Sequence, residues 1–415
     1  MSEGRRFLIY WAGQTLSAMG DAFAMVALPL LVLEATGSVA QMGLVSALGV
    51  VAQVGASLFA GPLVDRVDRR RLMIACDVGR AIIYTLVPVY WLLHGPALWL
   101  LGVTAFLGGA LGNTFLVAYV AALPSLVSAD RLNQANARLQ GASALAYVLG
   151  PILAGVVATG AGASWALAID SLTFLVSVAS LLLIRFSSPP ARRAHALESA
   201  RWAGPRFIWG HPTLRAMLIL LVLLGLTGSL GLGAGVTDLV IYHLKHDLGL
   251  GSHDVGLCLG IAAVGAVVGA VFAPRLRRRW GFGTCFLGGT MIQALGLATI
   301  GLIPFSAATA LGAFLWAGGM LLRGVAAIAL RQEVAPHTLI GRVTSTFWTF
   351  TFGASALGTT AVTRFAASVG ASLTFIVVGV AVGSVTAVGA LTPARTRRPE
   401  ETLARAPSAP PPAAA

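Results

Sequence analysis

The chain has 415 residues, of which 57% are hydrophobic and only 10% charged, and its 28 Lys and Arg residues outnumber its 15 Asp and Glu residues. A typical soluble domain contains about 25% charged residues, so this composition excludes a soluble globular protein. The apolar runs are also too long for a porin-like barrel, whose spans are segments of about 10 residues that alternate in polarity. The composition therefore indicates a helical protein that crosses a membrane many times.

Twelve apolar runs are long enough to cross a bilayer as helices, each of which needs roughly 20 mainly apolar residues. In chain order they cover residues 7–33, 39–63, 72–94, 96–121, 138–160, 163–185, 214–240, 254–273, 283–304, 306–330, 343–364 and 370–391. Arg5 and Arg6 precede the first run, as in a signal peptide. This run is too long for the apolar core of a signal peptide and leads directly into further runs, so we expect an uncleaved helix.

The longest connection between runs divides them into two groups of six. We therefore expect an all-α membrane protein with an N-terminal six-helix bundle (1–185), a linker (186–213) and a C-terminal six-helix bundle (214–392). The linker is rich in Pro and Arg at its start and then becomes amphipathic. The tail, residues 393–415, has too few bulky apolar residues to pack, and we expect it to be disordered.

The positive charges concentrate on one side of the membrane when successive loops are assigned to alternate sides. All basic residues fall on that side except Arg80, Lys245, Arg323 and Arg364. The positive-inside rule makes this side cytoplasmic, so both termini are expected in the cytoplasm. This topology accounts for the excess positive charge without nucleic acid as a partner. The strong preference for Arg over Lys is typical of a GC-rich bacterial genome, which indicates the bacterial inner membrane.

The two halves of the chain resemble each other weakly. The segment 61–71 after the second run aligns with 270–280 after the eighth. The aligned basic residues are Arg66, Arg69 and Arg70 in the first segment and Arg275, Arg278 and Arg279 in the second. Two helix bundles related by parallel pseudo-symmetry are typical of one large class of secondary transporters.

Three motifs are similar to patterns of a known transporter family. Residues 61–71, GPLVDRVDRRR, are similar to the loop pattern G-x-L-x-D-R-x-G-R-R, and residues 150–155, GPILAG, to the antiporter pattern G-P-x-x-G-G. The third set is Gln14, Ser17, Gly20 and Asp21 in the first run, together with Asn133, Asn136 and the segment 211–215. On these motifs the chain resembles the major facilitator superfamily over residues 5–392, and within it the macrolide and siderophore exporters. It departs from related drug exporters in having no basic residue within 96–121.

The resemblance implies a cytoplasmic gate at the loop between the second and third runs. In such proteins the loop carboxylate pairs with loop arginines and with the positive N-terminal end of span eleven, which holds the cytoplasmic side closed. Asp77 and Arg80, in the first turns of span three, are expected to extend this ionic latch. Asp68 replaces the usual glycine. The expected gate residues are Gly61, Asp65, Arg66, Arg69, Arg70, Asp77 and Arg80.

The motif in the fifth run contains Gly150, Pro151 and Gly155. Small residues let two helices approach closely, and proline bends a helix because it lacks an N–H group. The resemblance implies an exporter rather than an importer. An ordinary kinked membrane helix is the alternative interpretation.

Ionisable side chains within the apolar runs are candidates for function, because each costs at least about 2.5 kcal/mol at the bilayer centre. Asp21 lies roughly 21 Å into its run at about 1.5 Å per residue, close to the midplane. It could bind and release a proton as a cavity alternates between the two sides, or it could be a structural cap at a helix break. Asp170 is a second protonation site or a polar partner for neighbouring helices. Arg323 either reaches the interface or pairs with substrate or an acid.

Polar and aromatic side chains elsewhere in the runs are expected to line a substrate cavity. They are Gln14, Asn113, Tyr119, Gln140, Trp316, Arg323, Phe347 and Phe350. His243, His246 and Asp247 contain atoms that could bind a divalent metal, but a solvated loop is the preferred interpretation, and no metal or cofactor is expected. The sequence has no Walker loop and no catalytic GxSxG element, so we expect a gradient-driven transporter and not an enzyme.

Together these features predict a proton-driven antiporter that exports small amphipathic molecules such as antibiotics, drugs or secondary metabolites, a function associated with multidrug and antibiotic resistance. Two bundles would rock around a central cavity while Asp21 exchanges a proton for substrate. Its partners would be the substrate, protons and the lipid bilayer, and we expect a monomer. Two alternatives stay open: a facilitator or importer of a small nutrient or siderophore, and a non-transporting membrane sensor.

Overall fold

A computed structural model gives the fold of the chain and describes residues 3–123, 126–128, 131–184, 202–230, 235–336 and 339–399. Within these ranges the chain forms helices joined by short turns, and no β-strand occurs in them. The all-α prediction is therefore confirmed.

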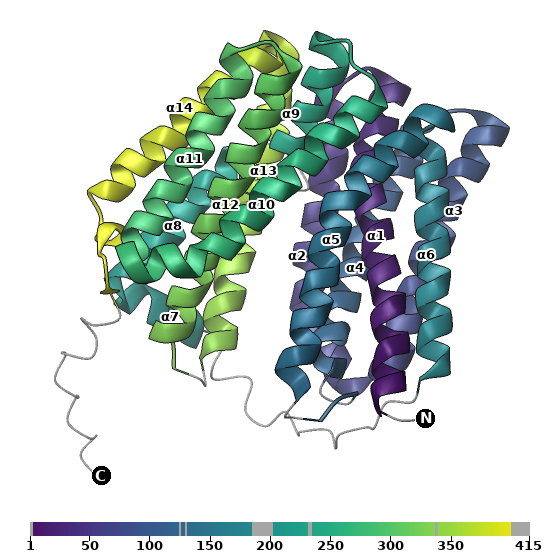
Figure 1. Cartoon of the computed structure of the whole chain (residues 1–415), viewed down its shortest axis with the longest axis horizontal. Helices are drawn as coiled ribbons and strands as arrows, with labels where there is room; N and C mark the ends of the chain where they lie inside the picture. The colour runs from purple at the N-terminus through teal and green to yellow at the C-terminus, as the bar shows by residue number, and fades with distance from the viewer. Residues whose placement is uncertain are drawn as a thin grey trace.

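Six helices make up the N-terminal half, and they coincide with the first six predicted runs. They are α1 (Glu3–Thr36), α2 (Val39–Arg66), α3 (Arg69–His94), α4 (Leu98–Ala122), α5 (Leu132–Gly160) and α6 (Ala163–Leu183). They pack mainly against one another: α1 contacts α5 and α6, α4 contacts α2 and α3, and α3 contacts α6. Figure 1 shows this group, coloured purple to blue-green, beside the green and yellow helices of the second half.

The C-terminal half begins with the short helix α7 (Ala203–Gly210), which falls in the amphipathic part of the predicted linker. The remaining elements are α8 (Pro212–Leu226), α9 (Val236–Tyr242), the π-helical turn His243–Asp247, α10 (Ser252–Trp280), α11 (Phe282–Leu302), α12 (Ser306–Val334), α13 (Ile340–Val369), α14 (Ala371–Ala390) and the 3₁₀ turn Pro393–Arg395. The central contacts of this half are those of α12 with α10 and α11, of α11 with α14, and of α8 with α13.

The predicted seventh run, 214–240, is not a continuous helix. It is interrupted between Leu226 and Val236, where Gly228 and Gly235 have positive φ angles of 66° and 67°. Glycine adopts this left-handed backbone without steric cost, so the chain can leave the helix inside the protein. In the described part of the chain, ten helices are long and apolar enough to span a membrane, or eleven if α7 and α8, bent by 106°, count as one span.

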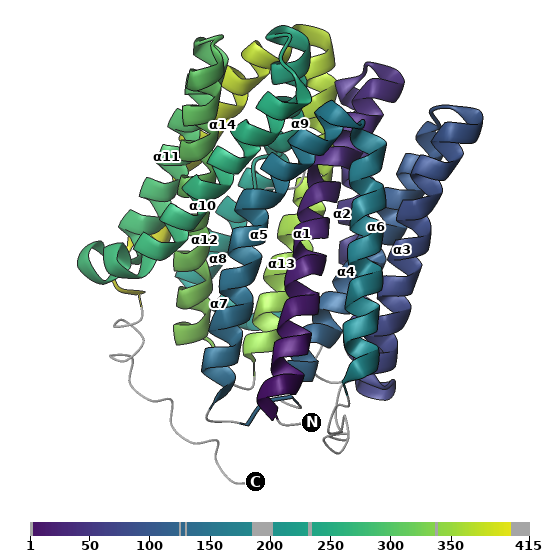
Figure 2. The same ribbon diagram turned by 45° about the vertical axis from the view of Figure 1, so that its right-hand side comes forward.

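The two halves touch mainly through two helix pairs, α5 with α10 and α2 with α13, and less extensively where α9 meets α1 and α2 (Figures 1 and 2). We call the end of the molecule where α1 begins and where α2 turns into α3 the basic face, and the other end the opposite face. A Cβ atom on Gly155 of α5 would lie only 2.6 Å from the carbonyl oxygen of Ser252 and 2.9 Å from the Cα atom of Gly256. These residues lie near the α5–α6 and α9–α10 turns, so the halves meet closely toward the opposite face.

The beginning of the predicted disordered tail is packed. The first two backbone N–H groups of α11, of Phe282 and Gly283, donate to the carbonyl oxygens of Arg397 at 2.8 Å and Thr396 at 3.2 Å. Ala394 is fully buried. A helix start has N–H groups with no partner inside the helix, and here the tail backbone supplies the acceptors. The prediction of disorder is therefore wrong for residues 393–399, and residues 400–415 lie outside the described ranges.

We expect Gly296→Ala to destabilise the C-terminal half. A Cβ atom there would lie 2.5 Å from the carbonyl oxygen of Gly312 and 2.6 Å from the backbone nitrogen of Trp316, so α11 and α12 would have to separate. Overpacking of this kind costs about 1–3 kcal/mol. Gly288→Ala on the same helix is the control, because its Cβ atom meets nothing within 4 Å. The free energy of unfolding in mixed detergent micelles measures the effect, and equal values for both variants would contradict the described packing.

Candidate functional site

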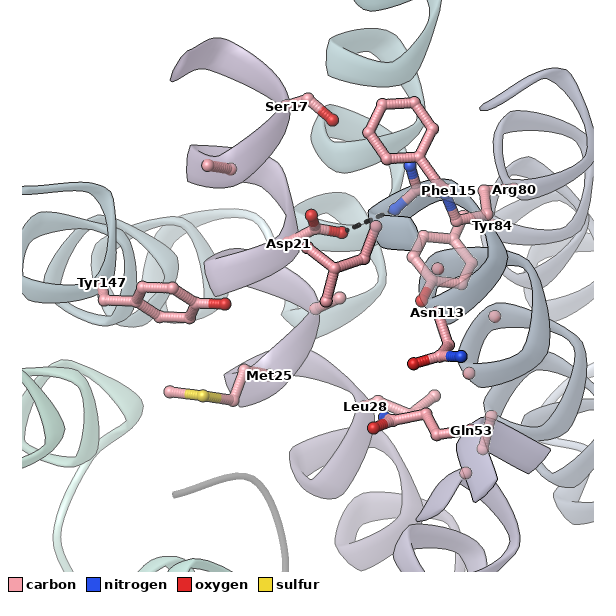
Figure 3. Close-up of a pocket in the computed structure, with 18 of the residues that line it drawn as sticks. Ser17, Asp21, Met25, Leu28, Gln53, Arg80, Tyr84, Asn113, Phe115 and Tyr147 are labelled. Carbon is pink, nitrogen blue, oxygen red and sulfur yellow. Dashed lines mark hydrogen bonds and ion pairs between the residues drawn. The ribbon is translucent and has the colours of Figure 1, made fainter. Parts of the chain in front are cut away.

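The N-terminal half encloses a cavity of about 550 Å³, which is lined by residues of α1 to α5. Its wall is both polar and apolar. Residues in the lining include Gln14, Asp21, Met25, Leu28, Gln53, Arg80, Tyr84, Asn113, Phe115, Tyr119, Gln140 and Tyr147. Figure 3 shows Asp21 and Arg80 facing each other across the cavity wall, with Tyr147 and Met25 on the other side of Asp21.

Arg80 lies between two carboxylates. One guanidinium nitrogen donates to Asp21 Oδ1 at 3.1 Å, and the other donates to Asp77 Oδ1, one helical turn earlier on α3. The Arg80 side chain is 3% exposed and that of Asp77 is fully buried, whereas the side chain of Asp21 is 43% exposed. Asp21 is therefore the member of this cluster that a solute or water in the cavity can reach.

Aromatic rings hold the guanidinium in place. The Cζ atom of Arg80 lies 4.0 Å from the ring centroid of Phe174 on α6 and 4.9 Å from that of Phe115 on α4. A cation over an aromatic face is attracted by the ring quadrupole, and more strongly so when it is desolvated. Arg80 thus contacts side chains of three other helices, α1, α4 and α6. Its ion pair with Asp77, on its own helix, does not depend on the charge of Asp21.

Asp170 lies behind Asp21, on α6. Its side chain is fully buried, and its Oδ1 atom accepts a hydrogen bond from Thr173 Oγ1 at 3.2 Å. In the described part of the chain its Oδ2 atom has no hydrogen-bond partner. Gly20 permits this arrangement, because a Cβ atom there would overlap Asp170 Oδ1 and Thr173 Oγ1. Asp170 packs against the back of α1 and is not among the residues that line the cavity.

Asp77 and Arg80 lie on α3, where the sequence analysis expected them to extend the ionic latch of the α2–α3 loop. In the structure Arg80 pairs with Asp77 and Asp21 inside the N-terminal half, and a role of Asp77 and Arg80 in the latch stays a prediction. This pairing is possible because the buried face of α3, which includes Met73, Asp77, Arg80 and Tyr84, points into the bundle.

The α2–α3 turn is organised by two of its own charged residues. Asp68 is the N-cap of α3, and its side chain accepts a hydrogen bond from the backbone N–H of Arg71 at 2.8 Å. Arg70 donates to the carbonyl oxygens of Leu181 at 2.6 Å and Leu182 at 2.7 Å, at the end of α6. Arg66 is exposed and Arg69 is half-buried, whereas the side-chain surroundings of Gly61 and Asp65 lie outside the description.

The glycine and proline motif of α5 lies where three helices meet. Gly150 faces Ala22 of α1, and Gly155 faces Gly256 of α10, while Pro151 is inside the helix with its carbonyl oxygen next to Gly256. A larger side chain at these positions would separate α5 from its neighbours. The motif therefore forms part of the contact between the two halves.

Four of the predicted cavity residues line the cavity and four do not. Gln14, Asn113, Tyr119 and Gln140 are in its wall. Trp316, Arg323 and Phe347 are at most 2% exposed and are packed inside the C-terminal half, and Phe350 is 56% exposed. Arg323 donates to Gln293 Oε1 at 2.9 Å, so a neutral amide is one partner of this buried cation. A single sequence shows that a polar residue lies in a span, but it does not show whether the side chain faces a cavity or is packed between helices.

Asp238 lies at the outer end of the predicted run 214–240, where the sequence predicts a solvated side chain. This prediction is wrong, because Asp238 is fully buried. Its Oδ1 atom accepts a hydrogen bond from Ser46 of α2 at 3.1 Å, and Ser46 is part of the cavity wall. The available signal was the glycine-rich stretch just before it, which interrupts the helix and turns Asp238 inward.

A cavity inside a bundle of membrane-spanning helices, with a charged cluster at membrane depth in its wall, defines a transporter. The profile of the Major Facilitator Superfamily matches residues 10–359, and the chain belongs to that family. It is a multi-pass membrane transporter and not an enzyme.

Curated relatives of the chain include exporters. The chain is 27% identical to the enterobactin exporter EntS of Citrobacter koseri over 333 residues, which cover 78% of this chain and 76% of that protein. It is 26% identical to the multidrug efflux pump Tap of Mycolicibacterium fortuitum over 388 residues, or 90% and 92% of the two chains.

Solved structures confirm the fold. The nucleoside transporter NupG superposes with a TM-score of 0.73 at 13% identity and covers 92% of this chain and 98% of its own. A bacterial homologue of the lysosomal transporter Spinster, in an inward-facing and unoccupied conformation, superposes with a TM-score of 0.72 at 13% identity over 99% of both chains.

Replacing Arg80 by Met should lower the free energy of unfolding by about 3–5 kcal/mol, because it leaves the carboxylate of Asp77 buried without a cation. Adding Asp77→Asn to the same variant should recover a large part of this loss. The control is Arg277→Met, which removes the Arg277–Glu333 pair, where Glu333 is 43% exposed. That change should cost less than about 1 kcal/mol. Equal losses for the two single variants would refute the compensation of charge described for Arg80.

Proposed function

We propose that the protein exports small amphipathic molecules across the bacterial inner membrane in exchange for protons. The observation that carries this proposal is the ion pair of Arg80 with Asp21 in the cavity wall, in which the side chain of Asp21 is 43% exposed and that of Arg80 only 3%. The exporter functions named for its relatives, of enterobactin and of several drugs, support the direction of transport.

The basic face is assigned to the cytoplasm, and both termini with it. Arg5, Arg6 and the arginines of the α2–α3 and α10–α11 turns all lie toward this face, in accordance with the positive-inside rule. The close contacts of α5 with α10 then lie toward the outer side. In this assignment the structure represents a state that is closed to the outside.

Proton exchange at Asp21 follows from the asymmetry of the cluster. When Asp21 takes up a proton, its attraction to Arg80 is lost, but Asp77 still compensates the guanidinium. A single proton can therefore bind to or leave Asp21 without leaving Arg80 as a buried cation with no counter-charge. An unpaired buried charge would cost several kcal/mol. Each proton that moves down a potential of 100 mV supplies about 2.3 kcal/mol for substrate export.

The second proposed proton site, Asp170, has a different environment. It packs behind Gly20 and takes a hydrogen bond from Thr173, away from the cavity. These contacts favour the structural alternative, in which Asp170 is a polar partner that holds α6 against α1. Exchange of protons with the cavity is assigned to Asp21 alone.

The composition of the cavity wall favours an amphipathic substrate. Met25, Leu28 and Phe115 supply apolar surface, and Gln53 and Asn113 supply amide groups that can donate or accept hydrogen bonds. Pockets of about 300–1,000 Å³ with this mixture bind drug-sized molecules. The cavity, at about 550 Å³, falls within that range.

The loop between α2 and α3 is proposed as the cytoplasmic gate. In the described state Arg70 fixes the start of α3 to the last carbonyl groups of α6. Gate closure would bring Asp65, Arg66 and Arg69 toward the C-terminal half, where a helix N-terminus attracts a carboxylate. Gly150, Pro151 and Gly155 would provide the small contact surface on which the halves rock.

Asp21→Asn should abolish export driven by a pH gradient, because an amide of nearly the same shape cannot exchange a proton. We expect at least about a tenfold lower rate in proteoliposomes, measured with a panel of macrolides, dyes and siderophores. Glu34→Gln is the matched control, since Glu34 is an exposed acid on the same helix, and its rate should be unchanged. Full gradient-driven export by the Asp21→Asn protein would show that proton coupling takes place elsewhere.

A further inference from the structure

The interruption of the seventh span is held by hydrogen bonds on both of its sides. On the α8 side, Gln293 Nε2 donates to the carbonyl oxygen of Ser229 at 2.6 Å. On the α9 side, Asp238 Oδ2 accepts the backbone N–H of Gly235 at 3.2 Å. Irregular backbone at membrane depth is tolerated only where it is buried in protein or lines a cavity, and in transporters interrupted helices often form the substrate and ion sites.

Asp238 makes a second contact that leaves its own half of the protein. Its Oδ1 atom accepts the hydroxyl group of Ser46 on α2, at 3.1 Å. One carboxylate, fully buried, thus connects the interrupted span of the C-terminal half with a helix of the N-terminal half. A hydrogen bond to a charged group in such surroundings is stronger than one between neutral groups.

The Ser46–Asp238 bond is located at the boundary between the cavity and the contact of the two halves. Ser46 lines the cavity, and one turn earlier on α2 Gly43 packs against Thr363 of α13. Thr363 and Gly43 pack closely, as do Gly155 and Gly256 in the other helix pair. Packing contacts between small residues can slide, whereas a hydrogen bond has to break before the helices separate.

We propose that Asp238 is the gating residue of the opposite face, and that its hydrogen bond with Ser46 holds the cavity closed on that side. This inference rests on the proposed alternation of the two halves but not on the identity of the substrate or the coupling ion. Separation of α2 from α9 breaks the Ser46–Asp238 bond, while the bond of Asp238 with Gly235 stays within its own half. Asp238 is therefore a positioning residue that links the interrupted span to the state of the cavity.

Ser46→Ala tests this role, because it removes the donor on α2 and leaves the Asp238–Gly235 contact intact. The control is Ser57→Ala on the same helix, whose hydroxyl group donates only within α2, to the carbonyl oxygen of Val54 at 2.7 Å. Spin labels at His94→Cys and Ser306→Cys report the opening of the opposite face, since both positions are exposed at the ends of α3 and α12. The native cysteines, Cys76, Cys258 and Cys285, are buried.

Distances between the labels are measured by pulsed electron spin resonance on the protein in lipid nanodiscs. For Ser46→Ala we expect the ratio of open to closed populations at the opposite face to rise by at least about tenfold, and for Ser57→Ala no change. An unchanged distance distribution for Ser46→Ala would overturn the proposal, even if Asp238→Ala changed it, because Asp238 would then serve only as the cap of α9. A shift in this experiment together with absent export in proteoliposomes would leave the gating role standing and reject the proposed function.

Discussion

Arg80 is buried in an apolar bundle, where a guanidinium is stable only if its charge is compensated and its position fixed. Asp77 provides a fully buried counter-charge from the same helix, and the ring of Phe174 covers the guanidinium from α6. Asp21 is the remaining partner, and its side chain is the most exposed of the three charged groups. The cost of burying Arg80 thus determines which carboxylate is free to change its protonation state, and the proposed proton exchange depends on that asymmetry.

Glycine residues determine how closely the helices approach one another, both within the N-terminal half and between the two halves. Gly20 lets α6 place Asp170 directly behind the segment of α1 that presents Asp21. Gly155 and Gly256 let α5 and α10 approach across the boundary between the halves. Contacts within each half are more extensive than those between the halves, and most of the contacts between them run along two helix pairs. Such an arrangement favours movement of the halves as rigid units, with the Ser46–Asp238 hydrogen bond as the polar link that must break.

The sequence predicted much of the fold, because span length and charge placement are imposed by the bilayer itself. All twelve apolar runs contain helix, and Asp21 lies in a cavity wall as an intramembrane acid should. The pairing of Arg80 with Asp21 was not predictable, because the spacing of Asp77 and Arg80 places them on one face of α3 without showing which helices that face contacts. The burial of Asp238 was not predictable because it depends on the interruption of the seventh span. The packing of the tail depends on hydrogen bonds from α11 to backbone carbonyl groups of the tail, which a pattern of side chains does not reveal.

The central claim is that substrate and proton compete through Asp21. Calorimetric titration of the purified protein with macrolides, cationic dyes and siderophores, in buffers of different ionisation enthalpy, measures how many protons are released for each ligand bound. The account predicts proton release on binding to the native protein and none on binding to the Asp21→Asn variant. Binding accompanied by the same proton release in both proteins would contradict it.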